Sequence, residues 1–261
     1  MTAATDSHSP VSPIDRLLRV MAALRDPDGG CEWDLAQDFS TIVPYTIEEA
    51  YEVADAVAGG DPAAICDELG DLLLQVVFHS QIATDEGLFG FDDVATAISD
   101  KMERRHPHIF GDAKAADVRV QWENIKAAER TSNGPKSALD GVALSLPALL
   151  RAQKLQGRAS RVGFDWPDAA GPRAKIAEEL EEVLTAADDI ERTEEIGDLL
   201  FAVVNYARHL GVDAESALRA ANDKFARRFK AVEERAGSDM TDLPLEALEA
   251  HWTSVKASER R

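Results

Sequence analysis

The sequence predicts an all-α protein made of two similar helical domains in tandem. Three observations lead to this class. Apolar residues recur with a period of about 3.6 along most of the chain, as they do on one face of a helix. No stretch alternates polar and apolar residues convincingly enough to be a strand. Four short blocks of the first half also return in the second half, and the 261 residues, 45% of them hydrophobic, suffice for two modest cores.

Helix start and stop signals divide the first half into five expected helices. Ser12 is a good N-cap, and Pro13 suits the first helical position. The Asp-Pro-Asp-Gly-Gly run at 26–30 ends this first helix. Gly60 ends the second helix, and Pro62 opens the third. We predict helices over 12–25, 44–58, 61–84, 92–106 and 118–130.

The second half has the same helical character after a linker. Residues 131–146 are rich in small and turn-forming residues, and Pro147 opens the next helix. Gly211 and Gly237 separate later helices. We predict helices over 147–161, 172–187, 190–210, 214–236 and 244–258. The expected organisation is a flexible tail (1–12), a first domain (13–130), the linker (131–146) and a second domain (147–261).

Four sequence blocks recur in the same order in both halves. EEAYE (48–52) matches EELEE (178–182), ELGDLLL (68–74) matches EIGDLLF (195–201), DKMERR (100–105) matches DKFARR (223–228), and WENIK (122–126) matches WTSVK (252–256). The offsets are 130, 127, 123 and 130 residues. A period this long indicates duplicated domains rather than solenoid repeats.

Four acids of the first half are spaced so that they meet. Glu49 and Glu52 share one face of the second helix, and Glu68 and Asp71 share one face of the third. Glu52 and Glu68 each lie eight residues from Gly60, and Glu49 and Asp71 each lie eleven away. At about 1.5 Å per residue, an antiparallel hairpin would hold all four roughly 12 to 17 Å from its turn.

The second half repeats this symmetry, although its turn is three residues shorter. Glu182 pairs with Glu195, and Glu179 pairs with Asp198, around the 188–189 midpoint. Carboxylates gathered at one level repel one another unless a cation binds. All-oxygen ligands suit Mg²⁺, Mn²⁺ or Ca²⁺ rather than Zn²⁺. Solvated acidic faces are the alternative for either quartet alone, but two matching quartets favour a metal site.

Other chemistries find less support in the sequence. A di-iron carboxylate bundle needs two Glu-x-x-His motifs, and the chain has only Glu103 with His106, beside Pro107 at a helix end. A glycine-rich phosphate-binding loop is absent. No serine or cysteine stands in a recognisable triad context. Metal-assisted hydrolysis therefore fits best.

Basic and aromatic residues recur at four-residue spacing, which places each pair on one helix face. Beside a metal site, basic pairs would neutralise the outer phosphates of a polyphosphate; elsewhere they would form solvated salt-bridge faces. The tryptophans are either core anchors or platforms for a base, and the lysines next to them are candidate phosphate contacts. The pairs are Lys101 with Arg105, Lys224 with Arg228, Trp122 with Lys126, and Trp252 with Lys256.

Composition narrows the class of partner and the compartment. The net charge of −20 argues against a nucleic-acid binder, which needs a basic face. Cys31 and Cys66 are too few for a disulfide scaffold or a zinc site, so a reducing cytoplasm is expected. Residues 1–12 lack the features of a signal peptide, and the apolar stretch 72–78 is too short to span a bilayer. We expect no membrane partner.

The acidic motifs resemble those of the MazG family of nucleoside triphosphate pyrophosphohydrolases, in its two-domain bacterial form. The family pattern EExxE…ExxD corresponds here to Glu48, Glu49, Glu52, Glu68 and Asp71, and to Glu178, Glu179, Glu182, Glu195 and Asp198. The resemblance spans about 14–258. It includes CEWDLAQDFSTIVPYT, DKMERRHPHIF, SLPALLRAQKLQ and RVGFDW. The chain departs from the usual CPWD at Glu32, where no metal ligand is involved.

This resemblance implies an all-α NTP pyrophosphatase fold, in which a homodimer completes the four-helix-bundle cores. It implies Mg²⁺, with Mn²⁺ as a possible substitute, and cleavage of NTPs or dNTPs to the monophosphate and pyrophosphate. We expect Glu178 or Glu179 to orient or deprotonate the attacking water. Lys224 and Arg228, with Lys256, would stabilise the leaving charge. By family analogy, the second half should dominate catalysis.

Two alternatives remain open at the level of sequence. One keeps the fold but narrows the substrate to dUTP, dCTP or phosphoribosyl-ATP. The other is a helical metal-binding scaffold without turnover, against which the intact acids of both halves argue.

Overall fold

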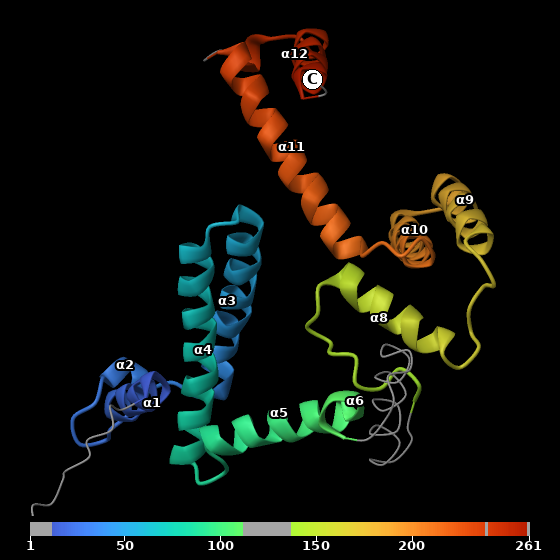
Figure 1. Cartoon of the computed structure of the whole chain (residues 1–261). Coiled ribbons are helices and arrows are strands. Elements are labelled where there is room, and N and C mark those ends of the chain that lie inside the picture. The colour runs from blue at the N-terminus through green and yellow to red at the C-terminus, as the bar shows by residue number, and fades with distance from the viewer. Residues whose placement is uncertain (1–11, 112–136, 238–239, 260–261) are drawn as a thin grey trace, which may run out of the picture. The chain divides into compact units, whose positions relative to one another are not determined.

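The computed structural model describes residues 12–111, 137–237 and 240–259 and divides the chain into two compact units, Met1–Glu129 and Arg130–Arg261. Within these described ranges all regular structure is helical, and no strand is formed (Figure 1). The predicted all-α class is therefore confirmed. The helix expected over 118–130 lies outside the described residues.

The first unit is organised around a helical hairpin formed by α3 and α4, which α1 and α5 contact. α1 packs against α4, and α4 continues through a short turn into α5. A small apolar core fills the space between α1, α3 and α4; its buried members are Met21, Ile42, Val77, Phe78 and Ile82. The helices are α1 Pro13–Leu24, α2 Glu32–Leu35, α3 Phe39–Gly59, α4 Pro62–Asp85, α5 Phe91–Arg105 and α6 Pro107–Phe110.

α3 begins five residues before the predicted start, because a capping box outweighs a proline. Asp38 accepts hydrogen bonds from the backbone N–H groups of Ser40 and Thr41, at 2.8 and 2.9 Å. Thr41 returns a bond by accepting from the Asp38 N–H at 2.9 Å. Pro44 lies inside the helix, where it removes one backbone hydrogen bond without ending the helix. The prediction that the helix starts at 44 was wrong.

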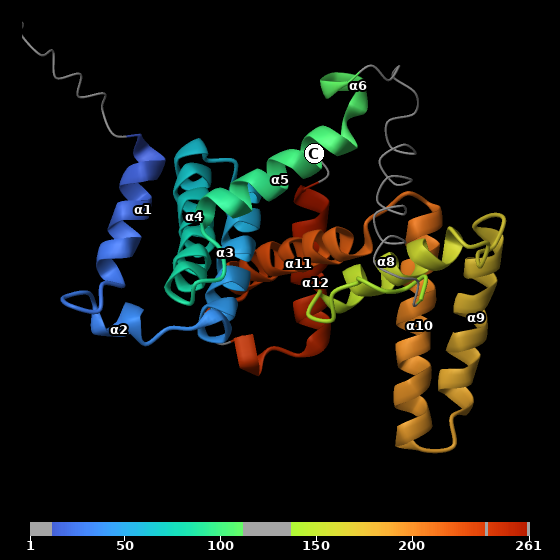
Figure 2. The same cartoon turned by 90° about the horizontal axis from the view of Figure 1, so that it is seen from below.

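The second unit contains a hairpin of the same kind. α9 and α10 pack side by side, α8 packs against α10, and α11 leads to α12. In both views the far part of α11 and all of α12 lie apart from the α9–α10 hairpin (Figures 1 and 2). The elements are α8 Ala148–Ser160, α9 Ala170–Thr185, α10 Asp189–His209, α11 Ala214–Ala236, a 3₁₀ turn Met240–Asp242 and α12 Leu245–Ser258.

Each hairpin turn is specified by local chemistry. Gly60 adopts the left-handed conformation (φ 74°) that closes α3, and Asp61 caps α4 by accepting from the Ala63 N–H at 3.0 Å. In the second unit Asp188 caps α10, accepting from the N–H groups of Ile190 and Glu191, both at 2.9 Å. None of the described helices is long and apolar enough to cross a bilayer.

Candidate active site

The α3–α4 hairpin brings three of the four predicted acids together. Oxygens of Glu49, Glu52 and Glu68 all lie within 4.8 Å of one another. Asp71 is not in this group of three, but its charge acts on both Glu49 and Glu68. The equidistant spacing around Gly60 thus produces the expected meeting of side chains.

Two acids of the first hairpin, Glu49 and Glu68, have raised pKa values. Burial raises the pKa of Glu49, and a hydrogen bond with Glu52 and the neighbouring charges raise it further. Burial and the charges of Glu52 and Asp71 also raise the pKa of Glu68. Above these raised pKa values the ionised cluster destabilises the fold, and protonation at lower pH relieves that cost. A divalent cation would give the same relief at neutral pH.

The α9–α10 hairpin forms the equivalent cluster. Oxygens of Glu179, Glu182 and Glu195 lie within 4.8 Å of one another. Burial raises the pKa of Glu182, as does a hydrogen bond with Glu179, although a nearby lysine opposes the shift. Burial and the charges of Glu182, Glu179 and Asp198 raise the pKa of Glu195. The two halves therefore carry the same crowded carboxylate arrangement.

Lys175 distinguishes the second cluster and was not predicted from the sequence. Its ammonium lies 2.6 Å from Oε1 of Glu179 and 2.8 Å from Oε1 of Glu178, and these bonds raise the lysine pKa. The sequence does carry a signal for this contact, because Glu178 and Glu179 follow Lys175 by three and four residues on one helix. The first-half position equivalent to Lys175, 130 residues earlier in the chain, is occupied by Tyr45. Glu178 faces this lysine from a largely exposed position rather than joining the cluster.

The chemistry of both clusters fits a divalent metal. Every donor is a carboxylate oxygen, as Mg²⁺ and Mn²⁺ prefer. Glu49 Oε2 and Glu179 Oε2 are each buried without a hydrogen-bond partner. A buried carboxylate oxygen left without a partner is costly, and a cation would satisfy it. Glu179 is only 3% exposed, so its free oxygen points into the protein rather than into solvent.

Of the predicted cationic and aromatic residues of the second half, Arg228 and Trp252 contact each other. Arg228 lies 2.6 Å from Oε2 of Glu259 and stacks over Trp252, with its guanidinium carbon 6.0 Å from the ring centroid. The Trp252 ring also contacts Phe225, at 5.4 Å between centroids. Lys224, Arg228, Trp252 and Lys256 belong to α11 and α12, which extend away from the α9–α10 hairpin (Figure 1).

In the first half, the corresponding residues are only partly described. Lys101 and Arg105 lie on α5. Trp122 and Lys126 fall outside the described residues.

A cavity of about 780 Å³ adjoins the second cluster. Lys175, Glu179 and Asp198 line the side nearest the acids, and Gln156 and Asn205 are among the residues lining the rest. Gln156 and Trp166 end the segments QKLQ and RVGFDW, which contributed to the family resemblance. The sequence predicted no role for these two residues or for Asn205. A buried amide has no periodic or spacing signature, so these residues could not be singled out from the sequence.

Comparison with known proteins identifies the family. The profile of the MazG nucleotide pyrophosphohydrolase domain matches residues 37–110 and 172–233, segments that contain both quartets. The chain is 51% identical, over 95% of its length and 99% of the relative's, to the nucleoside triphosphate pyrophosphohydrolase of Escherichia coli K12. It is 44% identical to the nucleoside triphosphate pyrophosphohydrolase/pyrophosphatase MazG of Thermotoga maritima, over 94% of this chain and 96% of that one.

A more distant relative agrees. The nucleoside triphosphate pyrophosphohydrolase of Mycobacterium tuberculosis H37Rv is 31% identical over 92% of this chain and 70% of its own length. Duplicated carboxylate hairpins, a profile match to each half and relatives similar over nearly the whole chain lead to one conclusion: the chain belongs to the MazG nucleotide pyrophosphohydrolase family.

Proposed function

We propose that this nucleoside triphosphate pyrophosphohydrolase holds Mg²⁺ in its carboxylate quartets and that the second unit carries most of the turnover. The observation that carries the proposal is the pair of buried carboxylate oxygens without partners, Glu49 Oε2 and Glu179 Oε2, each on a member of a cluster of three acids. Mn²⁺ would substitute because it accepts the same oxygen ligands. The products are the nucleoside monophosphate and pyrophosphate.

In the second unit Glu179, Glu182, Glu195 and Asp198 would hold the metal, and Glu49, Glu52, Glu68 and Asp71 would do so in the first. When bound, Mg²⁺ would neutralise phosphate oxygens and lower the pKa of a coordinated water. Glu179 is buried and fixed by Lys175, so it orients the attacking water from a defined position. Glu178, at the exposed edge, can accept the proton that the water gives up.

We further propose that a second copy of the chain completes the site. The hairpins expose apolar side chains at matching positions of α4 and α10, as helices do when a bundle lacks its other half. These are Leu69, Leu73 and Val76 in the first unit and Ile196, Leu200 and Val203 in the second. Lys224 and Arg228 lie on a helix directed away from their own hairpin, where they could serve the quartet of a partner chain.

The cytoplasm is the compartment that fits this activity, and Cys31 and Cys66 are both free and exposed, which suits a reducing environment. We propose no nucleic-acid or membrane partner, because the net charge of −20 opposes binding to phosphate backbones and anionic lipids.

Incubation with Mg²⁺ and any accepted nucleoside triphosphate should give the monophosphate and pyrophosphate in equal amounts. The reason is that the family's reaction breaks the bond between the α- and β-phosphates. Chromatography of the reaction mixture identifies the products. Nucleoside diphosphate and inorganic phosphate as products would contradict the predicted cleavage. A panel of NTPs, dNTPs and phosphoribosyl-ATP also tests the narrower substrate, and absence of turnover on the whole panel would favour the scaffold alternative.

A further inference from the structure

One ion pair between α11 and α12 holds a cation that was predicted to contact phosphate. Glu259 Oε2 accepts hydrogen bonds from Arg228 Nε at 2.7 Å and from Arg228 Nη2 at 2.6 Å. Its Oε1 lies 3.4 Å from Arg227 Nη2. Only 19% of the Arg228 side chain and 29% of the Glu259 side chain are exposed. Within the described ranges neither Lys224 nor Lys256 pairs with an acid, so of the three predicted cations only Arg228 is held in this way.

The contacts of Arg228 fix the direction of its guanidinium. A guanidinium has an edge formed by Nε and one Nη nitrogen, and another edge formed by its two Nη nitrogens. Glu259 occupies the first edge. Trp252 lies against the guanidinium, with its ring centroid 6.0 Å from the central carbon. In the described part of the chain no hydrogen bond involves Nη1, so the edge that suits two phosphate oxygens stays available.

Helix stability does not explain an acid at the end of α12. The C-terminal end of a helix carries a partial negative charge, so a carboxylate there is unfavourable. Glu259 is the C-cap residue of α12. The hydrogen bond from Arg228 lowers the pKa of Glu259, which favours its ionised form. The acid is therefore stabilised by its partner on α11 and not by its own helix.

The acid, the arginine and the tryptophan all recur in the first half of the sequence. WENIKAAER (122–130) matches WTSVKASER (252–260), so Glu129 corresponds to Glu259 and follows a tryptophan by the same seven residues. Arg105 corresponds to Arg228 in the DKMERR and DKFARR blocks. Four of the nine positions in the tryptophan segment differ between the halves, but the tryptophan, the lysine and the acid do not. The acid has therefore stayed with the residues that were predicted to contact the substrate.

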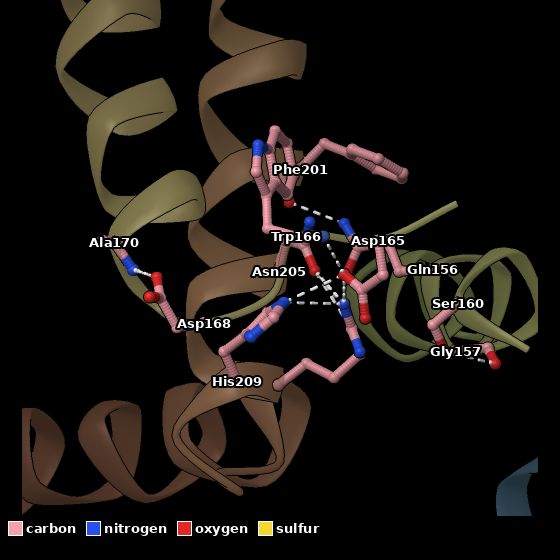
Figure 3. A network of polar contacts seen from close by, with 11 residues as sticks. Gln156, Gly157, Ser160, Asp165, Trp166, Asp168, Ala170, Phe201, Asn205 and His209 are labelled. Atoms are coloured by element: carbon pink, nitrogen blue, oxygen red, sulfur yellow. Dashed lines mark hydrogen bonds and ion pairs between the residues drawn. The ribbon is translucent and has the colours of Figure 1, made fainter. Parts of the chain in front are cut away.

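Another arginine–acid pair of the second unit is built differently. Arg208 Nη2 donates to Asp165 Oδ1 at 2.5 Å and to Asn205 Oδ1 at 2.7 Å (Figure 3). His209 Nε2 lies 2.9 Å from the same oxygen of Asp165. This network joins α10 to the segment before α9, and two protein acceptors share one nitrogen of the arginine. Arg228 instead has acid contacts along one edge only, as an arginine prepared for an external anion would have.

We propose that Glu259 is a positioning residue, which holds the guanidinium of Arg228 so that its two Nη nitrogens meet the outer phosphates of the substrate. A long side chain that is ordered only when the ligand binds weakens binding, and Glu259 supplies this order in advance. The assignment rests on the proposed function, in which Arg228 contacts the phosphates, and adds the residue that orients it.

Binding of inorganic tripolyphosphate in the presence of Mg²⁺, measured by calorimetry, tests this role. The parent protein is the full-length chain carrying Asp71→Ala, so that the first quartet does not contribute. Arg228→Ala should weaken binding by about 10- to 100-fold, because charge-assisted hydrogen bonds are lost. Glu259→Ala should weaken it by about 3- to 10-fold, because Arg228 keeps its charge but loses its orientation. In the Arg228→Ala background, Glu259→Ala should change binding by less than about twofold.

Glu259→Gln separates orientation from charge. Glutamine keeps an oxygen that can accept from Arg228, but it has no negative charge to repel phosphate. A positioning role therefore predicts that Glu259→Gln binds tripolyphosphate more tightly than Glu259→Ala does. If Glu259 were instead a counter-ion that competes with phosphate for Arg228, both variants would bind more tightly than the parent protein.

Glu249→Ala is the matched control for the loss of a negative charge from α12. Glu249 is exposed on the same helix and forms no ion pair with any residue that the structure describes. Its replacement should leave tripolyphosphate binding within about twofold of the parent protein, because an exposed charge contributes little. Circular dichroism and thermal unfolding of each variant show whether α12 still packs on α11.

The positioning role is overturned if folded Glu259→Ala binds tripolyphosphate as tightly as the parent protein or more tightly. It is also overturned if Glu259→Ala causes the same loss in the Arg228→Ala background, since the acid would then act through another group. Failure of the proposed function would look different. Arg228→Ala would itself bind as tightly as the parent protein, or the parent protein would release no pyrophosphate from hydrolysable substrates, and the positioning role would fall with it.

Discussion

Replacing Asp198 with alanine should lower pyrophosphate release by at least about 100-fold while the helical fold persists. Asp198 lines the cavity beside Glu179, and its charge contributes to the raised pKa of Glu195. If the quartet holds the metal as proposed, loss of Asp198 removes one ligand, misplaces the cation and takes away charge that the site needs. Alanine is the best helix former and Asp198 is exposed on α10, so circular dichroism should remain unchanged.

Asp71→Ala is the control for this substitution, because Asp71 holds the equivalent position of α4. It should leave most of the turnover intact if the second unit dominates. The decisive comparison uses initial rates at saturating Mg²⁺ and substrate. Undiminished activity in both variants would show that the quartets do not carry the metal for the reaction.

Glu179→Gln should reduce kcat far more than Glu49→Gln, by about 100-fold against less than about threefold. Each swap keeps the shape of the side chain and removes one charge. Glu179 is buried, pairs with Lys175 at 2.6 Å and lines the large cavity. Glu49 has the same buried free oxygen, but Tyr45 replaces the lysine beside it. The second site therefore has both an added cation and room for a substrate.

Equal losses in the two variants would mean two working sites, and a larger loss from Glu49→Gln would reverse the assignment. Circular dichroism of both variants separates a loss of activity from unfolding. Raised pKa values at Glu49, Glu182 and Glu195 mean that the ionised clusters strain the metal-free fold above those pKa values. Removing the charge of Glu49 should therefore leave thermal stability unchanged or raise it, whereas Glu179→Gln also gives up the ion pair with Lys175 and should lower it.

The sequence predicted the long helices well, because strong caps and a regular apolar period define them. α11 matches its predicted span of 214–236, and the MazG family is confirmed. The α3 boundary was wrong because the Asp38 capping box lies upstream of Pro44, the residue taken as the start signal. The short helices α2 and α6 were not predicted, since four residues are too few to show a period.

The candidate site was predictable where it depends on spacing and was not where it depends on packing. Equal distances from a turn are sufficient to place Glu52 opposite Glu68. The cavity of the second unit depends instead on which side chains fill the space between α8 and α10. Gln156 and Asn205 resemble ordinary helix residues in the sequence, and only their burial distinguishes them, together with the unpartnered Oε1 of Gln156. The roles of the quartets and of the α11 cations stay predictions.

Binding of Mn²⁺, followed by electron paramagnetic resonance, tests most directly the claim that the two quartets are metal sites. The measurement uses full-length protein at about 0.15 M salt, where the Debye length of about 8 Å screens weak binding to the acidic surface. The wild-type protein should bind Mn²⁺ in both units, Asp71→Ala and Asp198→Ala should each lose one site, and the double variant should lose both. A double variant that binds Mn²⁺ as tightly and in the same amount as the wild type would contradict the claim.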